Sequence, residues 1–319
     1  MIEEPRKLRV AIVGLGLDTS HHLVEESEAI SAGLDRERKR IKNNRSLSRK
    51  EKEELLRAVG GQELSRRREL RERVKARETV PGTVPEELAG ILGAYFGKKV
   101  EVLVEADALP NKTNFPSVLS DEQGEELTEH FRKLGKENDL VIAIGRNHSR
   151  AYPLYAGGAR VARFDAHTDA RPYDHEINCG NYVDAVIRNG LTEAKKITHY
   201  TMFNSKGKPD IFLSPLGEFV DVGKLPLNHD KEHDVVDVDV DVLHSSYDAQ
   251  SKWESSNLTS THVLRAVNGM KEPPKVLGFF EYRPEQDAHG FAKDLLVQLS
   301  RSLAQRHLER IQGFKPIKK

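Results

Sequence analysis

The sequence predicts an α/β protein with a parallel sheet that is covered by helices on both faces. Short apolar runs of strand length recur along the chain, and stretches rich in helix-forming residues separate them. Residues 140–144 (LVIAI) are apolar throughout, which is typical of a parallel strand buried on both faces. The 319 residues suffice for one large α/β domain, and we expect a single domain over 1–319.

The order of elements follows from apolar content and capping residues. Strands are predicted at 8–13, 100–104, 140–144, 161–164, 196–200, 235–241 and 276–280. Helices are predicted at 83–96, 120–134, 181–188 and 292–311. Ser120 and Gln123 form a capping box at the start of the second helix. Gly14 and Gly16 follow the first strand, but Thr19 replaces the third glycine of a dinucleotide fingerprint, so we interpret this segment as a tight turn.

Residues 25–80 differ from the rest of the chain in composition. They are rich in Glu, Arg and Lys and poor in β-branched residues, which favours helix. We expect a charged helical hairpin inserted in the domain, with helices over 48–59 and 63–78. Basic residues are in excess, but acidic residues lie among them and aromatic residues are absent. This pattern favours a solvated hairpin or an oligomer contact over an arm that binds nucleic acid.

Charge, cysteine content and hydropathy exclude several classes of protein. The formal net charge is zero, so overall charge indicates neither a nucleic-acid nor a membrane partner. Cys179 is the single cysteine, and an intramolecular disulfide is therefore impossible. The charged N-terminal segment differs from a secretory signal, and no apolar run approaches the roughly 20 residues that span a bilayer. We expect a cytoplasmic protein.

Acidic and imidazole side chains follow four of the predicted strands. Asp165, His167 and Asp169 alternate with smaller residues, so an extended backbone would place them on one face. In open α/β sheets, ligands bind at the carboxyl ends of the strands. For residues 165–169 alone, a solvated turn is the alternative. Because polar side chains follow four strands at the same edge of the sheet, a metal-binding site is favoured. The other side chains at these strand ends are His148, Asp239, Asp241 and Glu281.

The number of these groups predicts a centre with two metal ions. Asp237, Asp239 and Asp241 share one face of their strand, and such a row of like charges is destabilising when buried unless a cation neutralises it. Four carboxylates with two imidazoles suit two bridged divalent ions about 3.5–4 Å apart. The predicted metal ligands are His148, Asp165, His167, Asp169, Asp239 and Asp241.

The order and spacing of these segments resemble the arginase–agmatinase–formiminoglutamase superfamily, the ureohydrolases. That family carries Gly-Gly-Asp-His-Ser, Asp-Ala-His-x-Asp, Asp-x-Asp and Glu-x-Asn-Pro segments. The corresponding segments here are 145–149 (GRNHS), 165–169 (DAHTD), 239–241 (DVD) and 281–284 (EYRP). The resemblance implies a three-layer α/β/α, arginase-like fold with a mostly parallel sheet. It also implies a centre of two Mn²⁺ ions and a homotrimer or homohexamer.

The chain departs from the family pattern at several positions around the expected site. Arg146 and Asn147 replace a glycine and an aspartate before His148, and Arg283 replaces the asparagine after Glu281. His244-Ser245 stands where the family has Asp-Pro. Cys179-Gly180 is the nearest match to a His-Gly used in proton transfer, and formiminoglutamases also tend to lack that histidine. Arg283 is a candidate for binding a substrate carboxylate.

We expect a manganese-dependent hydrolase that cleaves a C–N bond, other than a peptide bond, in a linear amidine or guanidine. A metal-bridging hydroxide would be the nucleophile. Asp169 is predicted to orient it, and Glu281 to pair with the cationic nitrogens of a guanidino or formimidoyl substrate. His175 and His244 are candidate proton shuttles, with an ordinary loop residue as the alternative for each. Cys179 is expected to be a small buried residue rather than a nucleophile.

Two other functions compete with this prediction. A deacetylase-like amide hydrolase with one zinc ion would share the fold, but His148 and the doubled carboxylates disfavour it. A non-catalytic, metal-stabilised scaffold that binds through the basic hairpin is the second alternative. Arg146 and the missing proton-transfer histidine keep that alternative open.

Overall fold

A computed structural model describes residues 6–15, 39, 41–42, 83–105, 118–203, 217–243, 258–283, 287 and 289–313. The chain divides into two compact units, one of Met1–Leu17 with Gly82–Lys319 and the other of Asp18–Pro81. Apart from residues 39 and 41–42, the predicted hairpin at 25–80 lies outside the described residues, as does His244. The fold described below is that of the larger unit.

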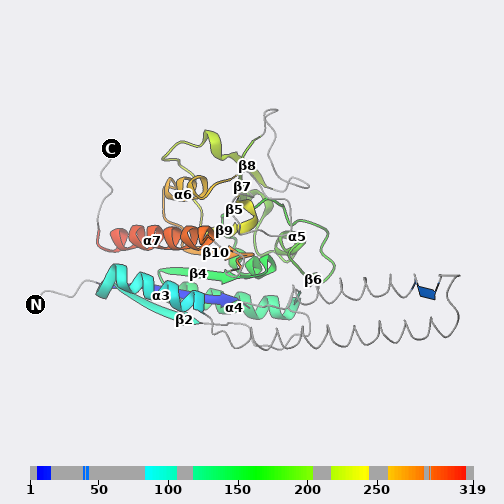
Figure 1. Ribbon diagram of the computed structural model, residues 1–319, viewed down its shortest axis with the longest axis horizontal. Coiled ribbons are helices and arrows are strands. Elements are labelled where there is room, and N and C mark those ends of the chain that lie inside the picture. Colours follow the sequence, from blue (N-terminus) through cyan, green and yellow to red (C-terminus); the bar gives the residue numbers. More distant parts are fainter. Residues whose placement is uncertain are drawn as a thin grey trace, which may run out of the picture. The chain divides into compact units, whose positions relative to one another are not determined.

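An eight-stranded sheet forms the centre of the larger unit (Figure 1). The strand order is β2-β1-β4-β10-β9-β5-β7-β8, and every neighbouring pair is parallel. The predicted parallel sheet is therefore confirmed, and β8 is an addition to it. The strands are β1 (Leu8–Leu15), β2 (Val100–Glu105), β4 (Leu140–Gly145), β5 (Val161–Phe164), β7 (Ile197–Thr201), β8 (Glu218–Asp221), β9 (Val235–Asp239) and β10 (Val276–Phe280).

Helices pack on both faces of this sheet, which gives three layers. One core cluster joins the sheet to α3 (Thr83–Phe96), α6 (Ser260–Asn268) and α7 (Phe291–Ile311). The other joins it to α4 (Asp121–Glu137), α5 (Tyr182–Arg188) and the 3-10 helix η2 (His148–Tyr155). Alternate residues of β1 enter opposite clusters, as the pleat of a strand buried on both sides requires. Figure 1 shows α7 and α4 on opposite sides of β4.

The smaller elements connect these layers. Strands β3 (Leu119–Ser120) and β6 (Glu176–Ile177) form a separate antiparallel pair. Four further 3-10 turns are present in the described part of the chain: η1 (Gly97–Lys99), η3 (Ala194–Lys196), η4 (Val222–Lys224) and η5 (Val240–Val242). No helix of the described residues is long and apolar enough to cross a membrane.

Two local features decide where elements begin and end near the site. The predicted capping box of α4 is present, with the Ser120 hydroxyl accepting from the Gln123 N–H and the Gln123 side chain accepting from the Ser120 N–H. The strand predicted at 235–241 instead ends at Asp239, because the Asp239 carboxylate accepts a hydrogen bond from the Asp241 N–H at 2.8 Å and starts η5. Asp241 thus lies in a 3-10 turn rather than in a strand.

Candidate metal centre

Four adjacent strands, in the order β4-β10-β9-β5, carry the predicted side chains at their carboxyl ends. Two sets of ligand atoms converge there, and within each set all atoms lie within 4.8 Å of one another. The first, called the His148 group, comprises His148, Asp165, Asp169 and Asp239. The second, called the His167 group, comprises Asp165, His167 and Asp241. The structure therefore brings all six predicted metal ligands together, and Asp165 belongs to both groups.

The His148 group surrounds one imidazole nitrogen with carboxylates. His148 Nδ1 lies 3.0 Å from Asp165 Oδ2, 3.2 Å from Asp169 Oδ2 and 2.8 Å from Asp239 Oδ2. The nitrogen is fully buried and makes no hydrogen bond of normal geometry with any described residue. A buried nitrogen with no hydrogen bond that faces three carboxylate oxygens fits a divalent cation with oxygen and nitrogen ligands.

The other side of the His148 ring rests on a buried hydrogen-bonding network. His148 Nε2 lies 3.0 Å from Asp237 Oδ1, and the hydroxyls of Tyr155 and Tyr182 donate to Asp237 Oδ2 at 2.7 and 2.9 Å. Burial lowers the pKa of His148, but the charges of Asp237 and Asp239 outweigh burial and raise it well above its usual value. A carboxylate in contact with Nε2 directs Nδ1 toward the ligand group, as in many metal sites.

The His167 group is less enclosed, because the His167 side chain is 20% exposed. His167 Nδ1 lies 2.8 Å from Asp241 Oδ2 and 3.6 Å from Asp165 Oδ1. Burial lowers the pKa of His167, but Asp165 and Asp241 outweigh burial and raise it to about 11. The imidazole is thus one of the cations that neutralise these carboxylates when no metal ion is bound.

Like charges in close contact perturb the carboxyl groups of the centre. Burial, followed by the charge of Asp165, raises the pKa of Asp169 to about 6. Burial, followed by the charges of Asp241 and Asp165, raises the pKa of Asp239 well above its usual range. Burial also raises the pKa of Glu281 to about 7, although Arg283 opposes it. Protonation of these carboxyl groups, or a cation bound between them, therefore relieves the repulsion between their charges.

Backbone geometry also marks this cluster. Asp169 and Glu281 have positive φ angles of 47° and 53°, which L-residues rarely adopt. Glu281 is held by two contacts: its Oε1 accepts from the His148 N–H at 3.0 Å, and its Oε2 accepts from Arg283 Nη2 at 3.3 Å. Such conformations cost about 1–3 kcal/mol and persist where the surroundings fix them, often at functional sites.

A pocket of about 110 Å³ opens over the two ligand groups. Glu281 lines it, as its predicted contact with substrate requires. Cys179 lines it too, and burial followed by the charge of Glu281 raises the pKa of this thiol to about 12, so the thiol stays protonated. Arg171 and Asn178 are lining residues that sequence reasoning missed, although Arg171 comes only two residues after Asp169. The full lining is His167, Asp169, Arg171, Asn178, Cys179, Gly180, Asp239, Asp241 and Glu281.

His175 lies elsewhere, although it was a candidate proton shuttle. Its side chain is 89% exposed, and its Nδ1 lies 3.7 Å from Asp121 Oδ2. It is not among the residues that line the pocket over the ligand groups. The structure therefore does not bring His175 to the centre.

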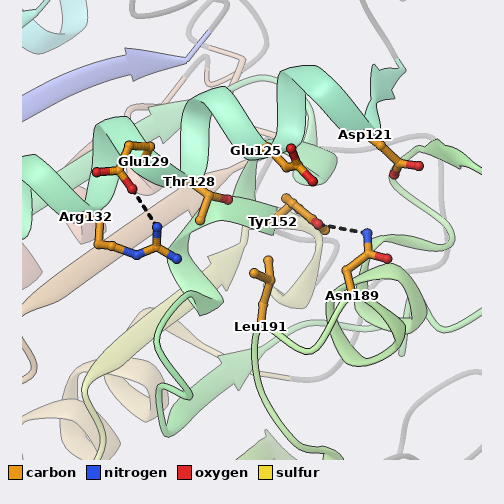
Figure 2. A pocket seen from close by; sticks show the side chains of 8 residues that line it. All are labelled: Asp121, Glu125, Thr128, Glu129, Arg132, Tyr152, Asn189 and Leu191. Carbon is orange, nitrogen blue, oxygen red and sulfur yellow. Dashed lines mark hydrogen bonds and ion pairs between the residues drawn. The ribbon is translucent and has the colours of Figure 1, made fainter.

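A larger pocket of about 510 Å³ lies beside α4 and contains none of the predicted site residues (Figure 2). Carboxylates of α4 line one side of it. Figure 2 shows Glu129 paired with Arg132, at 2.6 Å, and Asn189 donating to the Tyr152 hydroxyl at 2.9 Å. Neither ligand group reaches this pocket, so the smaller pocket is the candidate site. Its lining residues are Asp121, Glu125, Thr128, Glu129, Arg132, Tyr152, Asn189 and Leu191.

Arg163 is the main residue of the centre that the sequence pattern did not indicate. It lies in the middle of β5 and is fully buried. Its Nη2 donates to Asp169 Oδ2 at 2.7 Å and also to Asp165 Oδ2. Its Nη1 donates to the His167 carbonyl at 2.6 Å, and its Nε donates to the Tyr182 hydroxyl at 3.0 Å. A permanent cation therefore contacts the ligand carboxylates from within the sheet.

The sheet, its helical layers and the ligand cluster at its carboxyl edge together define an α/β protein of arginase-like fold with a buried His/Asp cluster able to bind metal. Comparisons with known proteins agree. A model described as the arginase family matches residues 98–207. No curated protein matches the chain. The match covers about a third of the chain, and it agrees with the predicted resemblance to that family.

Solved structures with the same fold have low sequence identity to this chain. The agmatine ureohydrolase of Thermoplasma volcanium has a TM-score of 0.52 at 15% identity, over 73% of this chain and 85% of that chain. An arginase from Medicago truncatula has a TM-score of 0.51 at 18% identity, over 71% and 81% of the two chains. An arginase from Bacillus subtilis has a TM-score of 0.50 at 14% identity, over 74% and 93%. These likenesses confirm the predicted arginase-like fold.

Proposed function

We propose that this protein is a hydrolase that uses two divalent metal ions, most simply Mn²⁺, to cleave a C–N bond in a linear amidine or guanidine. The observation that carries this proposal is the convergence of two overlapping ligand groups that share Asp165. Carboxylate and imidazole donors suit Mn²⁺ and similar ions. The resemblance to the arginase family supports the class of reaction.

Each ligand group would hold one ion. The His148 group offers three carboxylates and one imidazole, and the His167 group offers two carboxylates and one imidazole. When bound, a pair of divalent ions lowers the pKa of a water molecule and stabilises negative charge that develops on the substrate. The residues of the chain then have to bind the substrate and move protons.

Glu281 and Asp169 are the groups we assign to those tasks. Glu281 lines the pocket, and its carboxylate can pair with the cationic nitrogens of an amidine or guanidine. Its contact with Arg283 is long, at 3.3 Å, so a substrate cation can compete for the same oxygen. Asp169 also lines the pocket, so its carboxylate is placed to accept a proton from water and to donate one to the leaving amine.

The pocket wall favours a substrate that also carries a negative charge. Arg171 lines the pocket and is exposed, so its guanidinium can bind a carboxylate at the far end of the substrate. Arg283, the residue predicted for that task, instead contacts Glu281. We therefore favour an acidic guanidino or formimidoyl compound. The homo-oligomer, the cytoplasmic location and the charged hairpin at 25–80 stay predictions.

The experiment that tests this proposal measures turnover by the purified, full-length protein after removal of metal and addition of Mn²⁺ or Zn²⁺. The substrates are a panel of guanidino and formimidoyl compounds, and the products measured are urea, formamide and ammonia. Asp169→Asn should abolish turnover, whereas Asp174→Asn, an exposed aspartate of the same loop, should retain it.

The outcomes separate the three functions considered. Turnover with Mn²⁺ that Asp169→Asn abolishes supports the proposal. A single tightly bound Zn²⁺ per chain would support the deacetylase-like alternative instead. Absence of product from every compound with either metal would reject the hydrolase and favour the scaffold.

A further inference from the structure

The larger pocket beside α4 has the size of a small-molecule site (Figure 2). Its volume of about 510 Å³ lies within the range of about 300–1,000 Å³ that is usual for ligand pockets. It shares no lining residue with the smaller pocket, and no proposed metal ligand lines it. The proposed hydrolase activity therefore gives this pocket no role.

Negative charge dominates the lining of the larger pocket. Asp121, Glu125 and Glu129 follow one another at intervals of one turn along one face of α4, where like charges repel. Arg132 neutralises only Glu129, which it contacts at 2.6 Å. The start of a helix stabilises an acid in its first turn, which accounts for Asp121 but not for Glu125. Glu125 makes no hydrogen bond or ion pair with any described residue.

The hydroxyl of Tyr152 is an independent sign of a ligand. Tyr152 lines the pocket but is only 2% exposed. Its hydroxyl oxygen accepts from Asn189 Nδ2 at 2.9 Å, whereas its own hydrogen has no acceptor in the described part of the chain. Burial raises the pKa of this hydroxyl, so the hydrogen stays in place at neutral pH. A buried donor without an acceptor is costly, and a ligand with an oxygen atom would supply one.

We propose that this pocket binds a small organic cation that also carries a carbonyl or hydroxyl oxygen, such as an amino-acid amide. The ammonium or guanidinium group lies between Asp121 and Glu125, and the oxygen accepts from the Tyr152 hydroxyl. A cation between two carboxylates one turn apart replaces their repulsion with charge-assisted hydrogen bonds. Leu191 and the Tyr152 ring offer apolar surface to the carbon chain. This site does not depend on the proposed hydrolase activity.

An occupant of the larger pocket also acts on the wall of the smaller one, through Asp121. The Tyr173 hydroxyl donates to Asp121 Oδ1, so a cation bound at Asp121 competes with Tyr173 for this carboxylate. Tyr173 belongs to the segment 170–181, which follows the proposed metal ligand Asp169. Binding should therefore loosen the segment that supplies four lining residues of the smaller pocket: Arg171, Asn178, Cys179 and Gly180.

The test is isothermal titration calorimetry of the full-length protein at low ionic strength with three compounds of similar length. ε-Aminocaproamide carries both the cation and the oxygen, and it should bind once per chain. Caproamide lacks the cation and should bind about 10- to 100-fold more weakly, because the charge-assisted hydrogen bonds are lost. Hexylamine lacks the oxygen and should bind about 3- to 10-fold more weakly, because the Tyr152 hydroxyl stays without an acceptor.

Variants locate the binding. Glu125→Gln should weaken ε-aminocaproamide about 10-fold. Glu126→Gln is the matched control, because Glu126 is the exposed neighbour of Glu125 on α4 and lines neither pocket. Tyr152→Phe should remove the advantage of ε-aminocaproamide over hexylamine. Glu281→Gln alters only the smaller pocket and should leave the Kd unchanged. Amide hydrogens of residues 170–181 should exchange faster with ε-aminocaproamide bound.

Several results would overturn the inference and leave the hydrolase proposal intact. Equal binding of caproamide would do so, as would the absence of saturable binding by all three compounds. Binding that Glu281→Gln abolishes and Glu125→Gln retains would place the compound in the smaller pocket instead. Unchanged exchange at residues 170–181 would reject the link between the pockets. If Tyr152→Phe fails to fold, the three compounds and the exposed Glu125→Gln still decide.

Discussion

Without divalent ions, the folded protein should become less stable as the pH rises from about 5 to about 8. In the metal-free centre, the pKa of Asp169 rises from 3.8 to about 6 and that of Glu281 from 4.5 to about 7. The pKa of His167 rises from 6.5 to about 11. In this window the folded protein holds protons that the unfolded chain has released, so each increase in pH favours unfolding.

The magnitude follows from 1.36 kcal/mol for each pH unit over which one extra proton is held. Between pH 5 and 8, Glu281 contributes a loss of about 3 kcal/mol, His167 about 2 and Asp169 about 1. Asp165 and Asp237 do not offset this loss, because their lowered pKa values act only at more acidic pH. His233 does offset it, by about 2 kcal/mol, because burial lowers its pKa to about 4 and the unfolded chain holds the extra proton there. The net drop of about 4 kcal/mol corresponds to a fall in Tm of roughly 8–16 °C for a domain of this size.

Thermal melting in EDTA at pH 5, 6, 7 and 8 measures this drop, with matched samples in saturating Mn²⁺. The ion displaces the extra protons, so its stabilising effect should grow with pH. Glu281→Gln removes one of the titrating groups and should flatten the metal-free curve. A metal-free Tm that stays level or rises from pH 5 to pH 8 would refute the reasoning.

Three further predictions concern single residues. Asp237→Asn should weaken Mn²⁺ binding about 10- to 100-fold, because its charge no longer orients His148, and equilibrium dialysis measures the change. Cys179→Ala should leave turnover nearly unchanged. Iodoacetamide should alkylate the wild-type thiol only slowly at pH 8, which mass spectrometry can follow. Rapid alkylation would contradict the raised thiol pKa of about 12. Ser120→Ala should cost about 1 kcal/mol in urea unfolding, because the Gln123 N–H loses its acceptor.

The sequence could predict those elements whose signal is local. The apolar run of β4 and the capping box of α4 depend on neighbouring residues, and both predictions are confirmed. Helix α6 escaped notice because His262 stands where a capping box usually has Glu or Gln. The end of β9 at Asp239 depends on a side-chain contact with the next turn, which periodicity does not reveal.

For the centre itself, the spacing of Asp165, His167 and Asp169 was informative because one strand end positions all three. Arg163 was not predicted, since a charged residue in a buried strand is stable only with partners that lie elsewhere in the sequence. His175 was named for its nearness in the chain, but its loop directs it to Asp121. Contacts between segments that are distant in the chain could not be predicted from the single sequence.

The placement of the centre on β4, β10, β9 and β5 has a consequence for folding order. The contact between the His148 N–H and Glu281 joins segments 133 residues apart, and the ligands come from the middle of the sheet rather than its edges. The site is therefore assembled only after the long-range pairings, which are the slow ones, have formed. An ion would bind only late in folding, once these strands are paired, and would stabilise the paired strands. Amide hydrogens of these four strands should therefore exchange with solvent only through global unfolding, whereas those of β2 and β8 at the edges of the sheet should exchange earlier.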